Sequence, residues 1–264
     1  MKTGSIGMYE RRVRSVCGPD IRRIEEDPVV NEMPVTIMLN GEELVTLVCS
    51  PYEFELLATG FLVSEGLLRE PGDLLEITSR PEQGVVWVTT RGVRNLDGFL
   101  KRNFASCCGK GRPALHFLND YEQLCPIEHE VRFTVREVLQ FASLLNEASE
   151  AFRLTGGVHE AALARHGGLV ACFEDIGRHN ALDRILGYAF RNAVDTSGMA
   201  VVLSGRIASE MLTKAARIGV PVIVSRSAPT ALAIDLADQL GMTLVGFARN
   251  DRMSVYTHVR RITD

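Results

Sequence analysis

Two adjacent cysteines, Cys107 and Cys108, lie in the stretch FASCCGKGRP, between a serine and a run of glycine and basic residues. Neighbouring cysteines are poorly spaced for holding one tetrahedral zinc ion, and a disulfide between them would need a strained turn. Lys110 and Arg112 favour a thiolate over a thiol, so they lower the expected thiol pKa. A flexible thiolate in a positive environment can accept sulfur as a persulfide and pass it on. Two interpretations remain, a reactive thiol site and a pair of inert loop residues, and we favour the first.

The other four cysteines are isolated from one another in the sequence. They are expected to be reduced, because a chain of 264 residues can bury a core without disulfides. Cys49 and Cys172 lie in apolar stretches and are predicted to be core residues. No C-x-x-C occurs, and Cys125-Pro126 reverses the P-C-x-x-C order that a zinc deaminase would supply. Neither a structural nor a catalytic zinc site is therefore expected.

Small residues, hydroxyls and arginines follow three apolar stretches that are predicted to be strands. In open α/β sheets, ligands bind where the carboxyl ends of strands lead into helix N-termini with free N–H groups. Arginine forks and backbone amides suit phosphate. Any one of these segments can be ordinary helix capping, but three on neighbouring strand ends favour a nucleotide-like ligand. The segments are Ser204-Gly205-Arg206, Ser225-Arg226-Ser227-Ala228-Pro229-Thr230 and Arg249-Asn250-Asp251-Arg252.

Two further groups of polar residues leave their roles open. In one, His179 can do acid–base chemistry, or the group can be structural, with Asp175 capping a helix and Arg178 pairing with a carboxylate. In the other, His159 and Glu160 interrupt an otherwise apolar strand, and His159 can be a hydrogen-bonded core histidine. The first group consists of Glu174, Asp175, Arg178, His179, Asn180 and Asp183.

The first hundred residues are predicted to form mixed α and β structure. Asn40-Gly41 lies between two β-rich stretches and is a two-residue hairpin signal. A helix should follow, because Ser50 can cap it, Glu53 completes a capping box, and apolar residues recur at helical spacing up to Gly66. Residues 84–90, GVVWVTT, are predicted to form another strand.

The second half of the chain is predicted to be a layered α/β domain. A capping box of Thr134 and Glu137 starts a helix that runs to about Glu150. The continuous apolar strands 200–203 and 221–224 should be buried on both faces, as parallel strands covered by helices are. The predicted strands are 156–164, 168–174, 199–204, 221–225 and 243–248, and the predicted helices are 178–194, 207–219 and 229–241.

The fold class expected from these patterns is α/β, with a layered C-terminal domain preceded by a smaller α+β N-terminal domain. Little periodicity between about 103 and 130 predicts an exposed linker that carries the cysteine pair. The expected division is residues 1–103 for the N-terminal domain, 104–130 for the flexible cysteine-bearing loop and linker, and 131–264 for the α/β domain.

Charge and hydropathy argue against two classes of partner. With 33 acidic against 29 basic residues the formal charge is −4, so the chain lacks the basic field of a general nucleic-acid binder. No apolar run approaches the roughly 20 residues that cross a bilayer, and the first residues lack the apolar core of a signal peptide. A cytoplasmic protein with no membrane contact and a strictly local anion site is therefore expected.

Six motifs occur along the chain in this order: SCCGKG, TGGVHEAALA, EDIGRHNALDR, SGRIASEMLTKAA, SRSAPTALAIDLA and TLVGFARNDRMSVYTH. Together they resemble the formate dehydrogenase accessory sulfurtransferase family (FdhD) over nearly the whole chain. The resemblance implies a homodimeric cytoplasmic sulfurtransferase that takes sulfur from a cysteine desulfurase. It implies that this sulfur goes to the molybdenum cofactor, as molybdopterin guanine dinucleotide, which formate dehydrogenase requires. It also implies a C-terminal domain of cytidine-deaminase-like type without zinc.

The resemblance implies roles for particular residues as well. The persulfide-bearing cysteine of the family lies in a motif often written C-x-x-C-G-K, so Cys108 matches the second cysteine, whereas Ala105 stands where the first would be. Either Cys107 takes over the first role by a local shift or Cys108 acts alone, and we favour Cys107. The phosphates of a guanine dinucleotide would suit Ser204, Gly205 and Arg206. The cofactor-binding stretch of the family is similar to Phe247, Ala248, Arg249, Asn250, Asp251 and Arg252.

Two functions of different classes are therefore carried forward. In the first, the cysteine pair receives sulfane sulfur as a persulfide and delivers it to a dinucleotide cofactor held at the strand ends. In the second, the protein is a non-catalytic chaperone that binds and inserts the guanine dinucleotide cofactor, and the cysteines are incidental. Hydrolysis of the deaminase type is the weakest alternative, because the zinc ligands are missing.

Overall fold

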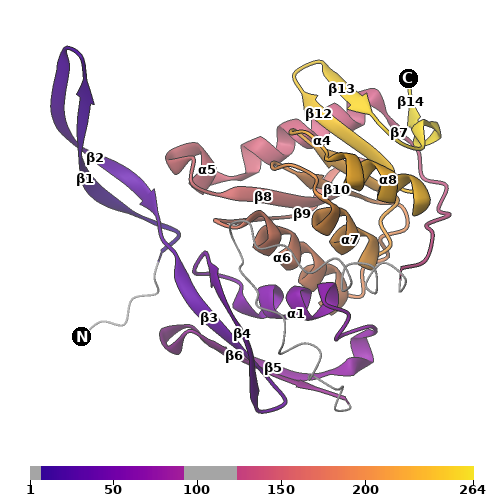
Figure 1. Cartoon of the computed structure of the whole chain (residues 1–264), viewed down its shortest axis with the longest axis horizontal. Helices are drawn as coiled ribbons and strands as arrows, with labels where there is room; N and C mark the ends of the chain where they lie inside the picture. The colour runs from indigo at the N-terminus through magenta and orange to yellow at the C-terminus, as the bar shows by residue number, and fades with distance from the viewer. Residues whose placement is uncertain (1–6, 92–123) are drawn as a thin grey trace.

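The computed structural model describes residues 7–91 and 124–264, and its central feature is a mixed six-stranded sheet (Figure 1). The strand order is β13-β12-β11-β10-β8-β9. β10, β11 and β12 run parallel to one another, whereas β8 is antiparallel to both its neighbours and β13 is antiparallel to β12. The ends of β9, β10, β11 and β12 and the start of β8 therefore share one edge. The bounds are β8 His159–Arg165, β9 Gly168–Asp175, β10 Ala200–Leu203, β11 Val222–Ser225, β12 Thr243–Arg249 and β13 Arg252–Val255.

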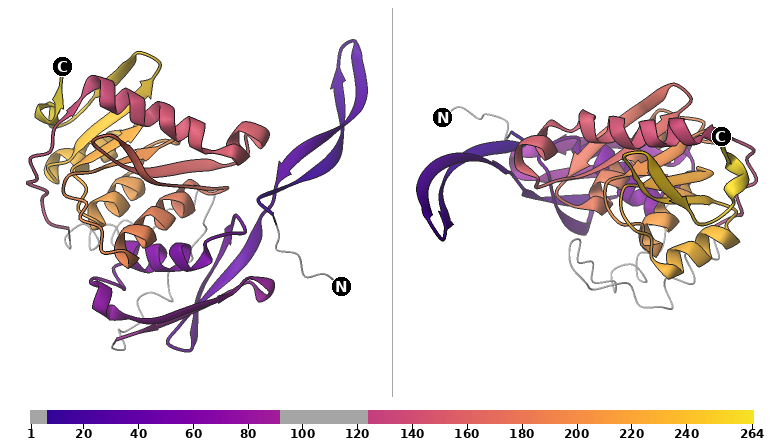
Figure 2. Two further views of the ribbon diagram at one scale, coloured as in Figure 1. Left: turned by 180° about the vertical axis from the view of Figure 1, so that it is seen from behind. Right: turned by 90° about the horizontal axis from the view of Figure 1, so that it is seen from above.

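Helices cover both faces of this sheet (Figures 1 and 2). Successive side chains of a strand point to opposite faces, so Val201 packs in one apolar cluster with α6 and α7, whereas Val202 packs in another with α4. The prediction that these strands are buried on both faces is confirmed. The helices are α4 Val135–Ala148, α5 Glu150–Thr155, α6 Arg178–Arg191, α7 Ser209–Arg217 and α8 Ala231–Gln239.

The expected cap of α4 is present, and Thr230 caps α8 as well. The Glu137 N–H donates to Thr134 Oγ1 at 3.2 Å and the Thr134 N–H donates to Glu137 Oε2 at 2.9 Å, so the predicted capping box at the start of α4 is confirmed. At the start of α8, the Ala233 N–H donates to Thr230 Oγ1. A short pairing of β7 (Phe133–Thr134) with β14 (Ile262–Thr263) ties the start of α4 to the end of the chain.

A smaller sheet of order β4-β3-β6-β5 is built from the N-terminal part of the chain. Asn40 and Gly41 join β3 to β4 with φ values of 51° and 90°, a left-handed pair that the Asn-Gly sequence favours. The predicted hairpin and the predicted strand at 84–90 are both confirmed. The bounds are β3 Met33–Leu39, β4 Glu42–Cys49, β5 Leu74–Arg80 and β6 Val85–Thr90.

Helix α1 (Phe54–Ser64) packs directly on α6 through a glycine in each helix. A Cβ at Gly60 would lie 1.6 Å from the carbonyl oxygen of Asp183, and a Cβ at Gly187 would lie 2.0 Å from the carbonyl oxygen of Leu56. Only glycine lets two helix backbones approach this closely. One apolar cluster consequently contains residues of both halves of the chain. The division into domains at 103 and 131 stays a prediction.

The expected cap of α1 is wrong. The N-cap position is Glu53, in the left-handed region with φ 47°, and no side chain caps this helix. Ser50 is buried elsewhere, because its N–H donates to Asp175 Oδ2 at 2.9 Å and its Oγ accepts from the Ile176 N–H at 3.2 Å. A contact distant in the sequence has therefore replaced the local one.

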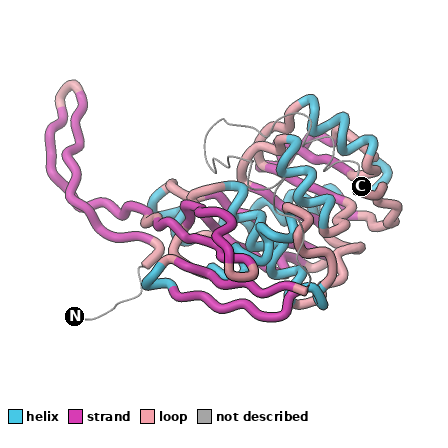
Figure 3. Tube along the Cα trace, turned by 60° about the horizontal axis from the view of Figure 1, so that its bottom comes forward, coloured by secondary structure: helices cyan, strands magenta, loops and turns pink. Residues whose placement is uncertain are grey.

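The first two strands form a twisted ribbon that projects from the body of the molecule (Figures 1 and 3). β1 (Tyr9–Gly18) and β2 (Ile21–Val30) pair with each other as a separate two-stranded sheet. On one face Arg14 bridges Glu25 and Asp27, at 2.7 and 2.8 Å. The sequence analysis did not predict this ribbon.

Candidate functional site

The loops that follow β10, β11 and β12 are hydrogen-bonded to one another at one edge of the sheet. The Arg226 N–H donates to the Leu203 carbonyl at 3.1 Å, and Ser225 Oγ donates to the Gly205 carbonyl at 2.7 Å. The Phe247 N–H donates to the Ser227 carbonyl at 3.1 Å. The three segments predicted to share an edge therefore do so, as parallel strands require.

The loops after β10 and β11 also pair as a short bridge. The Ile207 N–H donates to the Ala228 carbonyl at 3.1 Å, and the Thr230 N–H donates to the Ile207 carbonyl at 2.9 Å. This pairing fixes the backbone between Ser204 and the start of α7. Arg206 stays exposed beside it.

Gly205 allows His159 and Arg178 to approach the end of β10. A Cβ at Gly205 would lie 3.3 Å from His159 Nδ1 and 3.7 Å from Arg178 Cδ. Burial lowers the pKa of His159, and the nearby Arg178 lowers it further. Both effects favour the neutral imidazole of His159, in which one ring nitrogen donates a hydrogen bond and the other accepts one. At the start of α6, His179 Nε2 lies 3.6 Å from Glu210 Oε2, and the acid–base role of His179 stays one of two predictions.

Asp175 is a structural residue, but it does not cap α6 as the sequence suggested, because the N-cap is Gly177 and no side chain caps this helix. Its Oδ1 accepts from the Gly177 N–H at 2.8 Å and from Asn180 Nδ2 at 2.9 Å, at the start of α6. It also forms an ion pair with Arg184, and both side chains are fully buried. Arg184 Nη2 donates to the carbonyl of Ser50 at 3.0 Å. This network joins β9, α6 and the end of β4. It lies next to the edge of the sheet where the loops after β10, β11 and β12 meet, the loop edge.

On the α4 side of the same edge, Glu160 carries a buried carboxyl group with only 2% of its surface exposed. Neither of its carboxylate oxygens makes a hydrogen bond of normal geometry among the described residues. Burial raises the pKa of this carboxyl to about 7. The positive charge of Arg226 opposes the increase, the negative charge of Glu174 adds to it, and the nearby Ser149 hydroxyl acts weakly to lower the pKa. The backbone of Glu160 holds the end of β10, because the Ser204 N–H donates to the Glu160 carbonyl at 3.1 Å and the Glu160 N–H donates to Ser204 Oγ at 2.9 Å.

Two residues near Glu160 were not predicted. Asn146 of α4 accepts a hydrogen bond from Arg226, and Ser149, which begins α5, donates to Glu174. Asn146 lies in the last turn of the amphipathic helix α4 and Ser149 directly follows it, and the sequence pattern of this helix carries no sign that its end reaches the loop edge. Only the packing of α4 across the sheet brings them there.

The predicted cofactor-binding stretch 247–252 comprises the end of β12, the two-residue turn 250–251 and the first residue of β13. Phe247 and Asn250 have φ values of 54° and 58°, and exposed Arg249 and Arg252 are paired across the hairpin. The Arg249 guanidinium lies 5.9 Å from the centre of the Phe247 ring. Ala248 is buried, and Asn250 and Asp251 are exposed at the turn. Gly246 keeps this hairpin close to the loop after β11, because its Cβ would lie 2.9 Å from Pro229 Cδ.

The predicted reactive cysteines, Cys107 and Cys108, lie outside the described residues. Of the others, Cys49 is fully buried and burial raises the pKa of its thiol to about 12, which confirms its expected core position. Cys172 is half-buried against the α4 cluster, and burial likewise raises its pKa to about 12. Cys17 and Cys125 are exposed. Across residues 7–91 and 124–264, no three histidine, cysteine or acidic side chains gather as a metal site.

These features define a layered α/β protein whose polar loops gather at the carboxyl edge of its parallel strands. A family model described as the FdhD/NarQ family matches residues 30–263, and the chain belongs to this family. The sequence resemblance is therefore confirmed. In the part of the chain that the structure describes, no helix has the length and apolarity to cross a membrane.

Similar proteins cover almost the same length. The Sulfur carrier protein FdhD of Geobacillus kaustophilus is 43% identical over 240 residues, which is 90% of this chain and 91% of the relative. The protein of the same name from Bacillus subtilis is 42% identical over 241 residues, with 90% and 92% covered. The crystal structure of a formate dehydrogenase accessory protein from Desulfotalea psychrophila superimposes with a TM-score of 0.82 at 28% identity, over 97% of this chain and all of that one. The mixed α/β architecture is thus shared, and the cytidine-deaminase-like arrangement stays a prediction.

Proposed function

We propose that this protein is a cytoplasmic, homodimeric sulfur carrier that accepts sulfur from a cysteine desulfurase and delivers it to molybdopterin guanine dinucleotide for formate dehydrogenase. Membership of the FdhD/NarQ family and the names of its relatives support sulfur transfer and a link to formate dehydrogenase. The observation that carries the dinucleotide part is the joining of three polar loops at one sheet edge, from β10, β11 and β12.

The cargo fits this edge by its chemistry. The phosphates of a dinucleotide need donors and positive charge, which the backbone N–H groups of the loops and exposed Arg206, Arg249 and Arg252 supply. Gly205 leaves room for the side chains of His159 and Arg178, and Gly246 leaves room for Pro229, because glycine has no Cβ atom. We assign phosphate binding to residues 204–206 and 247–252, and recognition of the guanine base to the same loops.

The sulfur steps fall to Cys107 or Cys108. The thiolate attacks the outer sulfur of the persulfide on the desulfurase, a new S–S bond forms, and the cysteine thiolate of the desulfurase leaves. Delivery breaks that S–S bond and releases the outer sulfur as sulfide, which consumes two electrons. A second thiolate supplies them by attacking the inner sulfur, and a disulfide results. The adjacent cysteine or an external thiol can fill this role.

Mass spectrometry after incubation with a cysteine desulfurase and cysteine tests the carrier step. We expect one added sulfur atom on the peptide with Cys107 and Cys108, and no addition in the Cys107→Ser, Cys108→Ser double variant. The two single variants assign the acceptor. Cys17→Ser, which removes an exposed thiol on the ribbon, is the matched control and should load normally. A double variant that still loads sulfur and still activates formate dehydrogenase would refute the proposal.

A non-catalytic chaperone is the second candidate, because the loops that suit the dinucleotide are joined without any cysteine. The discriminating measurement combines GDP binding with activation of formate dehydrogenase. In the chaperone case the cysteine double variant would activate normally, whereas Arg249→Gln and Arg252→Gln would not. In the carrier case both kinds of variant fail to activate, and only the arginine variants lose GDP affinity.

A further inference from the structure

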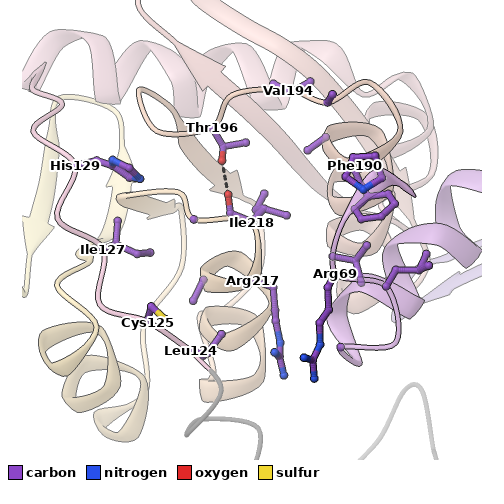
Figure 4. Close-up of a pocket in the computed structure, with 18 of the residues that line it drawn as sticks. Arg69, Leu124, Cys125, Ile127, His129, Phe190, Val194, Thr196, Arg217 and Ile218 are labelled. Atoms are coloured by element: carbon purple, nitrogen blue, oxygen red, sulfur yellow. Dashed lines mark hydrogen bonds between the residues drawn. The ribbon is translucent and has the colours of Figure 1, made fainter. Parts of the chain in front are cut away.

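A pocket of about 800 Å³ lies at the opposite edge of the sheet, next to the amino ends of β10 and β11 (Figure 4). Small-molecule sites usually measure roughly 300–1,000 Å³. Among the described residues, four segments line it: 63–71 from the end of α1 onward, 124–129, 189–196 at the end of α6, and 216–219 at the end of α7. None of the loop-edge residues described above contributes to its wall.

The wall of this pocket is apolar on one side and cationic on the other. Leu68, Ile127 and Phe190 supply apolar surface, including one aromatic ring. Arg69 and Arg217 come from different segments, and their side chains run side by side in the same direction (Figure 4). Of the described residues that line the pocket, none is acidic, whereas both guanidinium groups carry a positive charge.

We propose that this pocket binds a small molecule with a flat apolar body and one anionic group, such as a carboxylate, phosphate or sulfonate. The body packs between Phe190 and Ile127, which removes apolar surface from water. The anionic group lies against Arg69 and Arg217, whose planar forks match pairs of oxyanion oxygens. This site is separate from the proposed cargo edge and does not depend on the proposed sulfur transfer.

Strands β10 and β11 lie between the pocket and the loop edge and keep the two sites apart. β10 and β11 begin beside Thr196 and Gly219 in the pocket wall, and they end at the loops after Leu203 and Ser225. Each strand has four residues, which span about 10 Å at a rise of about 3.3 Å per residue. A ligand in the pocket therefore does not reach the loop edge.

The exposed thiol of Cys125 lines the pocket and reports on its occupancy. The probe is 8-anilinonaphthalene-1-sulfonate, which has an aromatic body and one sulfonate and fluoresces in apolar surroundings. We expect saturable fluorescence with the full-length protein. At ten times its Kd, the probe should slow alkylation of Cys125 by iodoacetamide about tenfold. Cys17, which is exposed on the ribbon, should react at an unchanged rate in the same sample.

Variants test the cationic side and the apolar side of the pocket individually. Arg69→Gln and Arg217→Gln should each weaken the probe about tenfold, the effect of losing one charge-assisted contact. Arg165→Gln removes an exposed arginine at the end of β8 and is the matched control. Val194→Trp, which fills the pocket from its wall, should abolish protection of Cys125, with circular dichroism to show that the variant is folded.

Three results would overturn this proposal. One is an unchanged alkylation rate of Cys125 at saturating fluorescence. Another is wild-type affinity in the folded Arg69→Gln, Arg217→Gln double variant. The third is loss of Cys125 protection on adding GDP, because the probe and the nucleotide would then share one site. Inorganic phosphate alone should give no protection, since it lacks the apolar body, and full protection by phosphate would contradict the apolar half of the proposal.

Discussion

Replacing Glu160 by glutamine should change how the stability of this protein depends on pH. The Glu160 carboxyl is almost fully buried and makes no hydrogen bond of normal geometry among the described residues, and burial raises its pKa from 4.5 to about 7. A folded state with the higher pKa binds the proton more tightly than the unfolded state. Ionisation of this carboxyl therefore costs the fold nothing below pH 4.5, where both states are protonated, and it destabilises the fold progressively between pH 4.5 and 7.

The size of the effect follows from the two pKa values. The difference of about 2.5 corresponds to about 3 kcal/mol of unfolding free energy, at roughly 1.36 kcal/mol per pKa unit. Glutamine has nearly the same shape and does not ionise. The Glu160→Gln protein should consequently gain about 3 kcal/mol relative to the wild type on going from pH 4.5 to pH 8.

Urea unfolding at pH 4.5, 6 and 8 measures this directly, with the wild type and the variant compared at each pH. Glu128→Gln, which alters an exposed glutamate, is the matched control and should follow the wild type at every pH. A difference between wild type and Glu160→Gln that is the same at all three values would refute the assignment of this raised pKa. Comparing within each pH cancels the contributions of all other ionising groups.

Three further variants test the packing. Gly60→Ala should lower the free energy of unfolding by about 3 kcal/mol or more, because the new Cβ would overlap the α6 backbone. Gly198→Ala is the control and should be neutral, because a Cβ there meets nothing within 4 Å. Equal urea midpoints for the two variants would contradict the α1–α6 contact. Asp175→Ala leaves the Arg184 charge buried and unpaired and should cost roughly 3–5 kcal/mol by thermal or urea unfolding, so a loss below 1 kcal/mol would be incompatible with the ion pair. Thr134→Ala should lower the free energy of unfolding by about 1 kcal/mol, because it removes the side-chain cap of α4. Circular dichroism gives the helix content as a second measurement. An unchanged stability would mean that the α4 cap is dispensable.

Local signals predicted the elements that local chemistry determines. The left-handed pair at Asn40-Gly41 and the Thr134–Glu137 box depend on residues close in sequence, and both are present as expected. The meeting of the three loops after β10, β11 and β12 was also predictable, because parallel strands that alternate with helices must end at one edge.

Features that depend on distant contacts were not predictable in the same way. Ser50 has the residue type of a helix cap, but its Oγ accepts from the Ile176 N–H instead, and α1 starts uncapped. The β1–β2 ribbon was not predicted because nine of the twenty residues in its strands are charged, which obscures the alternation of a half-buried strand, and its apolar Val13 and Ile24 are 72% and 76% exposed. The pocket combines residues from four segments, so no single stretch of sequence indicates it.

The ion pair of Asp175 and Arg184 gives the N-terminal half a part in shaping the loop edge. Arg184 donates to carbonyls of Ser50 and Tyr52, directly after β4, while Asp175 orders the turn into α6. Asp175 is also paired with His159 across β8 and β9, and His159 faces Gly205 at the end of β10. A shift of the small sheet against α6 must therefore move the turn that carries Arg178, or break a buried ion pair at a cost of several kcal/mol. The smaller sheet thus holds the edge in place as well as adding core.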